Sequence, residues 1–232
     1  MKSKEKLVTF DYLLNGEIFK VFVTFENKVK KTYRIKMTID KRIEISIYKK
    51  YDLNTIVKFL DKNQDWIKSS SQKFDKYLKY FNENFDIDVS ELFSKRKYLY
   101  LGKVYDNKLG LDFSYNSFFL KQEFDSMVLH KLYEKITLNY INPPKLIIKK
   151  LKSRWGSYNK KEHTITLNLY LLFFSEDIID YVIFHELTHT LVFNHSKDFY
   201  NELVKVCPNY KSIKEKMKLL SLISERLVAL EK

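Results

Sequence analysis

The sequence has little glycine and proline and only one cysteine. Four Gly and three Pro among 232 residues exclude long flexible or Pro-rich linkers, because such linkers are built from these residue types. The glycines are also scattered, so the chain has no Gly-rich loop of the kind that cradles phosphates. The single cysteine, Cys207, excludes an internal disulfide, and we interpret it as a packing thiol in a reducing cytoplasm.

Long apolar runs are missing as well. The stretch that follows the basic N-terminus is interrupted by Asp11, Asn15 and Glu17, so it lacks the apolar core of a secretion signal. The most apolar region, near 169–193, carries several acidic residues, which argues against a membrane-spanning helix. We therefore expect a cytoplasmic protein that does not associate with membranes.

The composition that is present is typical of a globular protein. Hydrophobic residues make up 45% of the chain and aromatic residues 16%, and the length allows one large domain or two small ones. The net charge of +13 comes mainly from lysines, with local concentrations at 28–36, 145–154 and 205–218. A nucleic-acid partner is one interpretation of this charge. A lysine-rich solvated surface is favoured instead, because no nucleic-acid-binding motif accompanies the charge.

The first fifty residues read as strands. Val8–Leu14 and Ile18–Phe25 flank Asn15-Gly16, a strong hairpin signal, because both turn residues tolerate positive φ. Tyr33–Ile39 and Ile43–Ile47 alternate apolar with polar residues and predict a second hairpin.

The apolar spacing then changes to steps of three and four residues. This spacing predicts a helical segment near 53–83. A short β region follows, with strands expected at 98–101 and 118–120. Apolar residues at helical spacing return over 128–140, and Pro143-Pro144 ends that helix.

The last third alternates short strands and turns before a helix begins. Leu146–Lys152 and Thr164–Leu167 predict two strands, which suggests a hairpin, and Arg154–Ser157 predicts a turn between them. Ser175 can cap the helix that follows, and the two acidic residues after it favour the positive end of the helix dipole.

This helix carries the motif H-E-x-x-H. His185 and His189 are four residues apart, which puts them about 40° apart in rotation and roughly 6 Å apart along the axis, so both can bind one ion. Glu186 can accept a proton from a metal-bound water and pass it to a leaving group. Imidazole ligands favour zinc over magnesium.

His195 is the candidate third ligand. A continuous helix would turn it about 240° away from His189, so the helix should end in between, with Asn194 in a left-handed conformation. Ser196 can then cap a new helix. The apolar face expected for that helix comprises Phe199, Leu203 and Val206. Three protein ligands leave one position open for water.

Other ligands were considered beside these three. An acidic residue could replace His195, and Glu202 is the candidate because it lies one to two turns into the next helix. His130 and His163 are isolated in the sequence, and we interpret them as structural.

Several short segments accompany the metal motif. They are Arg154–Ser157 (R-W-G-S), Ile165–Asn168 (a strand ending in L-N), Asp180–His189 (D-Y-V-x-x-H-E-L-x-H), Asn194–Phe199 (N-H-S-x-x-F), and upstream Asp65–Ile67 and Tyr100–Gly102. In these segments, from about residue 30 to 212, the chain resembles the YgjP-like metallopeptidase family, which is related to the SprT-like zinc peptidases.

The resemblance implies an α+β fold. It implies a β-rich N-terminal part over 1–125, which contains the helical segment near 53–83, and a zincin-like catalytic domain over 126–232. In that domain the H-E-x-x-H helix would pack on a small sheet. The three histidines would bind one zinc ion per chain, and Glu186 would be the catalyst.

The sequence departs from the family's pattern at two places. Tyr158 stands where the family usually has a cysteine, so no role of that thiol carries over. Pro143-Pro144 stands where the family often has a Gly-containing turn, which leaves the path into the strand at Leu146 open.

Three further residues are candidates for the site. Arg154 could stabilise an oxyanion or bind a carboxylate or phosphate, or it could be structural. Asn168 has the same two interpretations, and Ser196 is a candidate for substrate contact or for support of the ligands. Trp155-Gly156 is interpreted as packing of the turn against the active helix.

The sequence therefore predicts a zinc-dependent metallopeptidase that acts on a peptide or protein. One alternative is a nucleoside triphosphate pyrophosphatase or phosphohydrolase, which the positive charge would suit, although such enzymes normally recruit magnesium through carboxylates. The other alternative is a nucleic-acid-associated repair peptidase, which the SprT-like relatives and the charge suggest.

Overall fold

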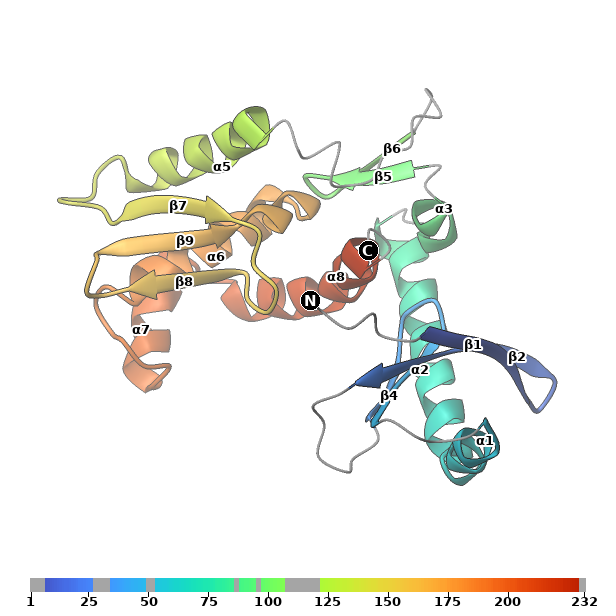
Figure 1. The fold of residues 1–232 in the computed structure, drawn as a ribbon. Helices are drawn as coiled ribbons and strands as arrows, with labels where there is room; N and C mark the ends of the chain where they lie inside the picture. Colours follow the sequence, from blue (N-terminus) through green and yellow to red (C-terminus); the bar gives the residue numbers. More distant parts are fainter. Residues whose placement is uncertain are drawn as a thin grey trace. The chain divides into compact units, whose positions relative to one another are not determined.

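The computed structural model divides the chain into two compact units, Met1–Ser90 and Glu91–Lys232. The chain combines helices with β-strands, which agrees with the mixed α and β composition of the predicted fold class (Figure 1). The residues that the structure describes are 7–26, 34–48, 53–85, 88–94, 97–106 and 122–229. The predicted domain boundary between residues 125 and 126 stays a prediction, because the segment 107–121 just before it lies outside the described residues.

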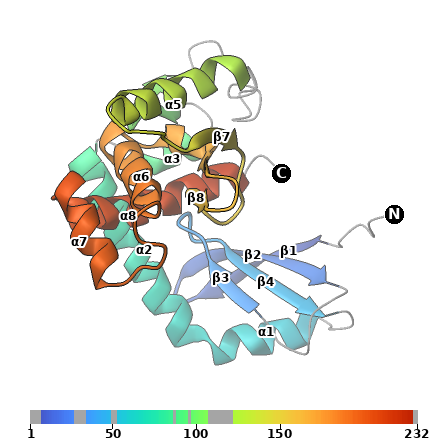
Figure 2. The same ribbon diagram turned by 90° about the vertical axis from the view of Figure 1, so that its left-hand side faces the viewer.

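The first unit contains a four-stranded sheet in the order β1-β2-β4-β3 (Figure 2). The strands are β1 (Leu7–Leu14), β2 (Glu17–Glu26), β3 (Arg34–Met37) and β4 (Ile43–Tyr48). Both predicted hairpins are confirmed, since β1 pairs antiparallel with β2 and β3 pairs antiparallel with β4. Asn15 and Gly16 turn the first hairpin with φ of 51° and 83°, a geometry that these residue types tolerate. β2 and β4 run parallel and join the hairpins into one sheet.

Two helices follow where the apolar spacing predicted a helical segment. They are α1 (Leu53–Lys62) and α2 (Gln64–Phe85). The side-chain amide of Asn63, between them, donates to the carbonyl of Phe59 (2.7 Å) at the end of α1. Apolar residues of both helices and of the strands share one core, which includes Val21, Val23, Ile43, Ile45, Ile56, Leu60 and Ile67. The apolar residues that recur at every second position in the strands therefore pack against those that recur at helical spacing in α1 and α2.

A short helix and a hairpin come next in the chain. They are α3 (Val89–Phe93), β5 (Lys97–Tyr100) and β6 (Lys103–Asp106). The strand predicted at 98–101 is confirmed, and the one predicted at 118–120 lies outside the described residues. The turn residue Gly102 has φ of +72°, and a Cβ added to it would lie 2.8 Å from Cβ of Ser175. Gly102 is therefore required both by the turn and by this close packing.

Helix α5 (Gln122–Thr137) ends before the predicted limit at residue 140. The hydroxyl of Tyr133 donates to the carbonyl of Pro144 (2.5 Å), which ties the helix to the segment that leads into the next strand. Asn142 has φ of 58° and takes the left-handed position of the turn. The chain therefore passes from α5 into the strand that begins after Pro143-Pro144 through a turn at Asn142, which the sequence alone did not predict.

A three-stranded sheet has the order β7-β9-β8. Its strands are β7 (Lys145–Lys149), β8 (Gly156–Asn159) and β9 (Thr164–Asn168). The suggested hairpin of the two predicted strands is wrong, because β7 and β9 pair in parallel and the hairpin is formed by β8 and β9. Gly156 and Ser157 begin β8 instead of completing the predicted turn. The four residues of β8 have no apolar alternation that could have announced a strand.

The rest of the second unit is helical. Its elements are η1 (Leu169–Phe173), α6 (Glu176–Thr188), α7 (Lys197–Val206) and α8 (Tyr210–Ala229). Helix α6 packs against β8, β9, α5, α7 and α8 (Figure 1). Because neighbours surround it, most of its residues are buried. Among the described residues, no helix is both long enough and apolar enough to cross a membrane.

The starts of α6 and α7 differ in detail from the prediction. Ser175 and Ser196 occupy the N-cap positions, but neither side chain makes a capping hydrogen bond. Ser175 instead accepts a hydrogen bond from Lys216 (3.3 Å), whose ammonium also pairs with Asp177 (3.1 Å). Phe199 and Leu203 are buried as expected, whereas Val206 is 42% exposed and does not extend the apolar face. Cys207 is buried, in agreement with its interpretation as a packing thiol.

Candidate metal centre

The end of α6 carries the H-E-x-x-H motif. His185 lies in its last turn, and His189 is its C-cap residue. Their ring centroids are 5.1 Å apart, since residues four apart are neighbours on a helix surface. The helix alone therefore places two imidazoles side by side.

His195 reaches this pair from the loop between α6 and α7. Its Nε2 lies 2.9 Å from Nε2 of His185, and its ring centroid lies 4.7 Å from that of His189. The predicted end of the helix before His195 is confirmed, because α6 ends at Thr188. Asn194, however, does not adopt the positive φ expected of it. The backbone amides of Leu191 and Val192 instead donate to the carbonyl of Thr188 (both 3.0 Å), which forms a turn after the helix.

The three imidazoles fit a single zinc ion. One ligand nitrogen from each histidine can be chosen so that all three lie within 4.8 Å of one another. Tetrahedral zinc with bonds of about 2.0–2.1 Å to nitrogen separates its ligand nitrogens by about 3.4 Å, so small side-chain shifts satisfy it. Nδ1 of His189 lies 3.2 Å from the carbonyl of Val192, so a proton on Nδ1 would leave Nε2 free to bind a metal ion. Three ligands leave a fourth position for water or substrate.

The aromatic ring of Phe199 lies against all three imidazoles. Its centroid lies 4.9 Å from the ring of His185, 4.6 Å from that of His189 and 4.8 Å from that of His195. Phe199 has no exposed surface. A buried ring at the same distance from three imidazoles restricts their rotation, which favours a formed site before any metal binds. The sequence identified Phe199 only as part of an apolar helix face.

Glu186 is buried against β8, with 5% of its surface exposed. The backbone N–H of Tyr158 donates to its carboxylate. A Cβ added to Gly156 would lie 2.7 Å from Oε1 of Glu186 and 2.8 Å from its Cγ. The start of β8 therefore fixes the position of this carboxylate, and the absence of a side chain at Gly156 leaves room for it.

The electrostatic surroundings suit these residues to metal binding and proton transfer. Burial, together with the charges of nearby histidines and Lys214, lowers the pKa of His185 to about 3. Burial also lowers the pKa of His189. Burial raises the pKa of Glu186 to about 7, although the Tyr158 N–H and the charge of Arg154 oppose this. These two imidazoles are thus neutral near pH 7, and Glu186 can gain or lose a proton there.

Asn168 holds the backbone around the site. Its Oδ1 accepts hydrogen bonds from the amides of Leu151 and Tyr170 (both 3.2 Å). Its Nδ2 donates to the carbonyls of Leu151 (3.0 Å) and Arg154 (2.9 Å). All four hydrogen-bonding positions of the buried amide are used by the backbone, so we interpret Asn168 as a structural residue.

The other candidates lie at the margin of the cluster. Arg154 is exposed, and its charge acts on Glu186. Ser196 is half-buried at the start of α7. Glu202 lies outside the histidine cluster and binds Lys205 through both carboxylate oxygens (2.7 Å each).

His130 and His163 also lie outside the cluster. Nδ1 of His130 lies 2.8 Å from the carbonyl of Ser126, and Nε2 of His163 lies 3.0 Å from the carbonyl of Asn142. These contacts agree with the structural interpretation of both histidines.

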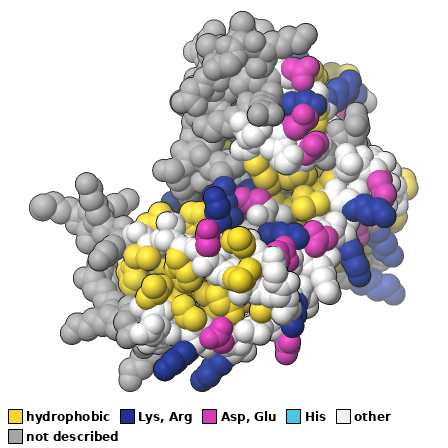
Figure 3. Space-filling model, turned by 90° about the vertical axis from the view of Figure 1, so that its right-hand side faces the viewer, with side chains coloured by type: hydrophobic (Ala, Val, Ile, Leu, Met, Phe, Trp, Pro, Cys, Tyr) yellow, Lys and Arg dark blue, Asp and Glu magenta, His cyan; other side chains and the backbone are white. Residues whose placement is uncertain are grey.

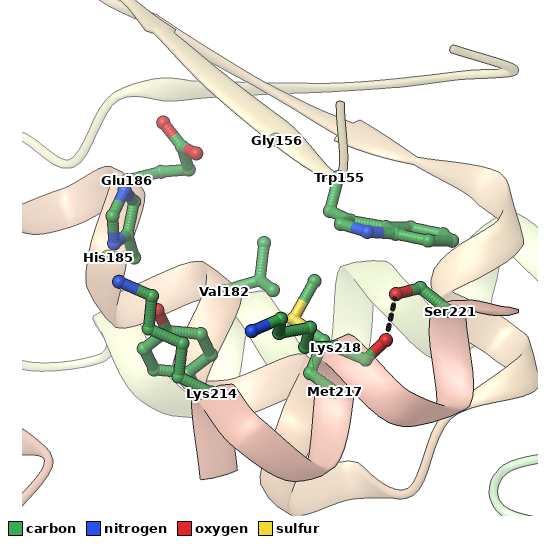
Figure 4. Close-up of a pocket in the computed structure, with 10 residues that line it drawn as sticks. Trp155, Gly156, Val182, His185, Glu186, Lys214, Met217, Lys218 and Ser221 are labelled. Carbon is green, nitrogen blue, oxygen red and sulfur yellow. Dashed lines mark hydrogen bonds between the residues drawn. The ribbon is translucent and has the colours of Figure 1, made fainter. Parts of the chain in front are cut away.

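A pocket of about 400 Å³ lies beside Glu186 and His185 (Figure 4). Helix α8 lines it with Lys214, Met217, Lys218 and Ser221, and Trp155 and Val182 line it from other elements. The sequence missed these α8 residues. Their spacing of three and four residues marks one helix face, but the sequence does not say which face meets the site.

The positive charge does not gather on the face shown in Figure 3. There, Lys and Arg side chains are interspersed with Asp and Glu. Elsewhere in the chain, Lys41 forms ion pairs with Glu17 (2.9 Å) and Asp75 (2.7 Å), which shows that acidic residues offset part of the positive charge. Binding of nucleic acid stays a prediction.

Comparisons with known proteins identify a family that this chain matches over most of its length. The family model described as "YgjP-like, metallopeptidase domain" matches residues 31–219. The chain is 37% identical over 71 residues to an uncharacterized protein of Methanocaldococcus jannaschii. The aligned region covers 29% of this chain and 64% of that relative. The chain thus spans less than two thirds of that relative's length.

Two crystal structures of metallopeptidase zymogens are also similar to part of the chain. Abylysin of Pyrococcus abyssi has 32% identity and a TM-score of 0.35, over 38% of this chain and 90% of that one. Jannalysin of Methanocaldococcus jannaschii has 28% identity and a TM-score of 0.33, over 38% of this chain and 96% of that one.

Proposed function

Because the chain belongs to the YgjP-like metallopeptidase family, we propose that it is a zinc-dependent peptidase whose three clustered histidines bind the metal and whose Glu186 moves the proton. The observation that carries this proposal is the convergence of three imidazoles within 4.8 Å beside a buried carboxylate. We also propose that this part of the chain is a zincin-like domain. Its active-site helix would be α6, which packs against β8 and β9.

Zinc, when bound, polarises a substrate carbonyl and lowers the pKa of water to about 7. The residues of the chain supply the rest of the chemistry. Glu186 takes the proton of the attacking water on its carboxylate and delivers it to the amide nitrogen, which leaves as an amine. The Tyr158 N–H and the open space at Gly156 hold the carboxylate in position.

Hydrolysis of nucleoside triphosphates is not favoured. That reaction normally uses magnesium held by carboxylates and substrate phosphates. The cluster of potential ligands found among the described residues consists of imidazoles. A peptide or protein substrate therefore fits better. A role as a nucleic-acid-associated repair peptidase and a cytoplasmic location stay predictions, and a DNA titration across salt concentrations tests the first.

Metal analysis and peptide cleavage test the proposal together. We expect one zinc ion per chain in the purified protein and loss of most of it in His189→Ala and His195→Ala. His130→Ala is the matched control and should keep its zinc, because His130 is exposed and outside the cluster. A chelator should abolish cleavage of a peptide panel, and added zinc should restore it. Retention of zinc in both ligand variants would contradict the site. Release of phosphate or pyrophosphate without cleavage of peptides would contradict the function.

A further inference from the structure

We propose that the pocket along α8 selects the substrate: it binds a bulky apolar group against Trp155, Val182 and Met217, and Lys214 binds a carboxylate of the same peptide close to the scissile bond. This inference rests on the proposed peptidase function. The pocket reaches from Glu186 and His185 along α8, so whatever fills it lies next to the reacting bond (Figure 4). Its volume of about 400 Å³ is within the range of pockets that enclose small organic groups.

One side of the apolar part of the pocket is rigid, and another side carries a flexible side chain. Trp155 packs edge-to-face on the buried ring of Phe174, with centroids 4.8 Å apart at 71°, which holds the indole in place. Val182, on α6, is 4% exposed. Met217, on α8, has a flexible and polarizable side chain that can adjust to groups of different shape. Such a lining favours a large apolar side chain over a small or polar one.

The charged part of the pocket is the ammonium of Lys214. In Figure 4 it points toward His185, which lines the same pocket. No acidic partner of Lys214 is found in the part of the chain that the structure describes. Its ammonium lies 5.8 Å from the ring centroid of Tyr200. Lys216, two residues away on the same helix, binds Asp177 and does not line the pocket.

An ammonium beside a dication is unfavourable by itself, because like charges repel. Lys214 is exposed, so water screens this repulsion in the free protein. A substrate carboxylate between the lysine and the metal site would compensate both charges. Lys218 lies one helical turn further along the pocket. Its ion pair with Glu215 spans 3.8 Å between largely exposed groups and is worth little, so Lys218 can contribute to the same preference.

The carboxylate could come from an acidic side chain or from the C-terminus of the peptide. Cleavage of matched peptides separates the two sources. One peptide carries an internal Glu beside a Phe, a second has the Phe at a free C-terminus, a third has the same C-terminus amidated, and a fourth carries Lys in place of Glu. We expect the wild-type kcat/KM to be at least about tenfold higher for one or both carboxylate peptides than for the other two, which corresponds to about 1.4 kcal/mol.

Variants of Lys214 then test the assignment. Lys214→Met should remove the preference, Lys214→Arg should keep it, and Lys214→Glu should shift it toward the Lys peptide. Lys211→Met is the control, because Lys211 is exposed on the same helix and outside the pocket. Failure of zinc-loaded wild type to cleave any peptide would contradict the peptidase function itself. Cleavage with no charge preference, or a preference unchanged in Lys214→Met, would overturn the inference and leave the peptidase function standing.

Binding without turnover gives a second readout. The chain has two tryptophans, so Trp66→Phe leaves Trp155 as the only indole fluorophore. In the double variant Trp66→Phe with Glu186→Gln, titration with the preferred peptide should change the Trp155 emission. Adding Lys214→Met should weaken this binding about tenfold. Saturable binding that leaves the Trp155 emission unchanged would show that the apolar group is not placed against the indole.

Discussion

Gly156→Ala should displace the catalytic carboxylate without removing any catalytic group. The φ of Gly156 lies outside the left-handed region, so alanine can adopt the backbone conformation. The added Cβ would nevertheless lie 2.7 Å from Oε1, 2.8 Å from Cγ and 3.0 Å from Cδ of Glu186. Rotation of the carboxylate group alone cannot relieve a contact with Cγ, so the whole side chain has to move.

The size of the effect follows from two estimates. Overpacking a buried site costs about 1–3 kcal/mol, which lowers Tm by several degrees in a unit of this size. A catalytic group misplaced by about 1 Å costs about 100-fold in rate. We therefore expect kcat/KM of Gly156→Ala on the best peptide to fall about 100-fold. Zinc content should stay unchanged, because the three atoms nearest to the added Cβ all belong to Glu186 and none to a histidine.

Gly102→Ala is the matched control. Its Cβ would clash with Ser175, at 2.8 Å from Cβ and 2.9 Å from Cα, and the φ of +72° adds backbone strain. It should lower Tm at least as much as Gly156→Ala, while kcat/KM per folded, zinc-loaded molecule stays within about twofold of wild type. A folded, zinc-loaded Gly156→Ala with wild-type kcat/KM would refute the reasoning.

Three further predictions concern stability and metal affinity. Asn168→Ala removes four buried hydrogen bonds to the backbone and should lower the free energy of unfolding by about 2–4 kcal/mol in urea titrations; a change below about 0.5 kcal/mol would contradict its structural role. Phe199→Leu loosens the three ligand rings and should weaken zinc binding about 10- to 100-fold in chelator competition, whereas unchanged affinity would exclude support by this ring. Burial raises the pKa of Glu186 from 4.5 to about 7. The folded metal-free protein therefore binds this proton more tightly than the unfolded chain does. Because of this group, the free energy of unfolding falls as the pH rises from 4.5 to about 7. Glu186→Gln should therefore stabilise the metal-free protein by up to about 3 kcal/mol above pH 7 and by little near pH 4.5, and an equal difference at both pH values would contradict the pKa.

Local patterns in the sequence were sufficient for much of the fold. The Asn15-Gly16 turn and the alternating residues around it predicted the first hairpin. Residues at helical spacing predicted one helical segment near 53–83, which the structure divides into α1 and α2. The pairing of β7 with β9 was not predictable in the same way. The apolar residues of β7 and β9 are compatible with either parallel or antiparallel pairing, so they do not indicate the direction of pairing. The strand between them in the sequence, β8, has no apolar alternation.

The residues of the site also differ in whether local sequence could predict them. His185, Glu186 and His189 could be predicted because one helical turn fixes their relation, and His195 follows at a short distance in the chain. Gly156 lies against Glu186, and Lys214 lines the pocket beside it, and they belong to a strand and a helix that are separate from α6 in the sequence. Gly156 was predicted only to pack the turn, and Lys214 only added to a local concentration of charge. Their importance depends on tertiary contacts that no periodicity encodes.

The most direct test of the central claim is to measure zinc content and peptide cleavage on the same preparation of Glu186→Gln. Glutamine keeps the shape of the side chain, and the three histidines are untouched, so the account predicts one zinc ion per chain. It also predicts loss of cleavage by at least about 100-fold, because an amide cannot take the proton from the attacking water. Cleavage at the wild-type rate with zinc bound would contradict the role of Glu186 and with it the proposed mechanism.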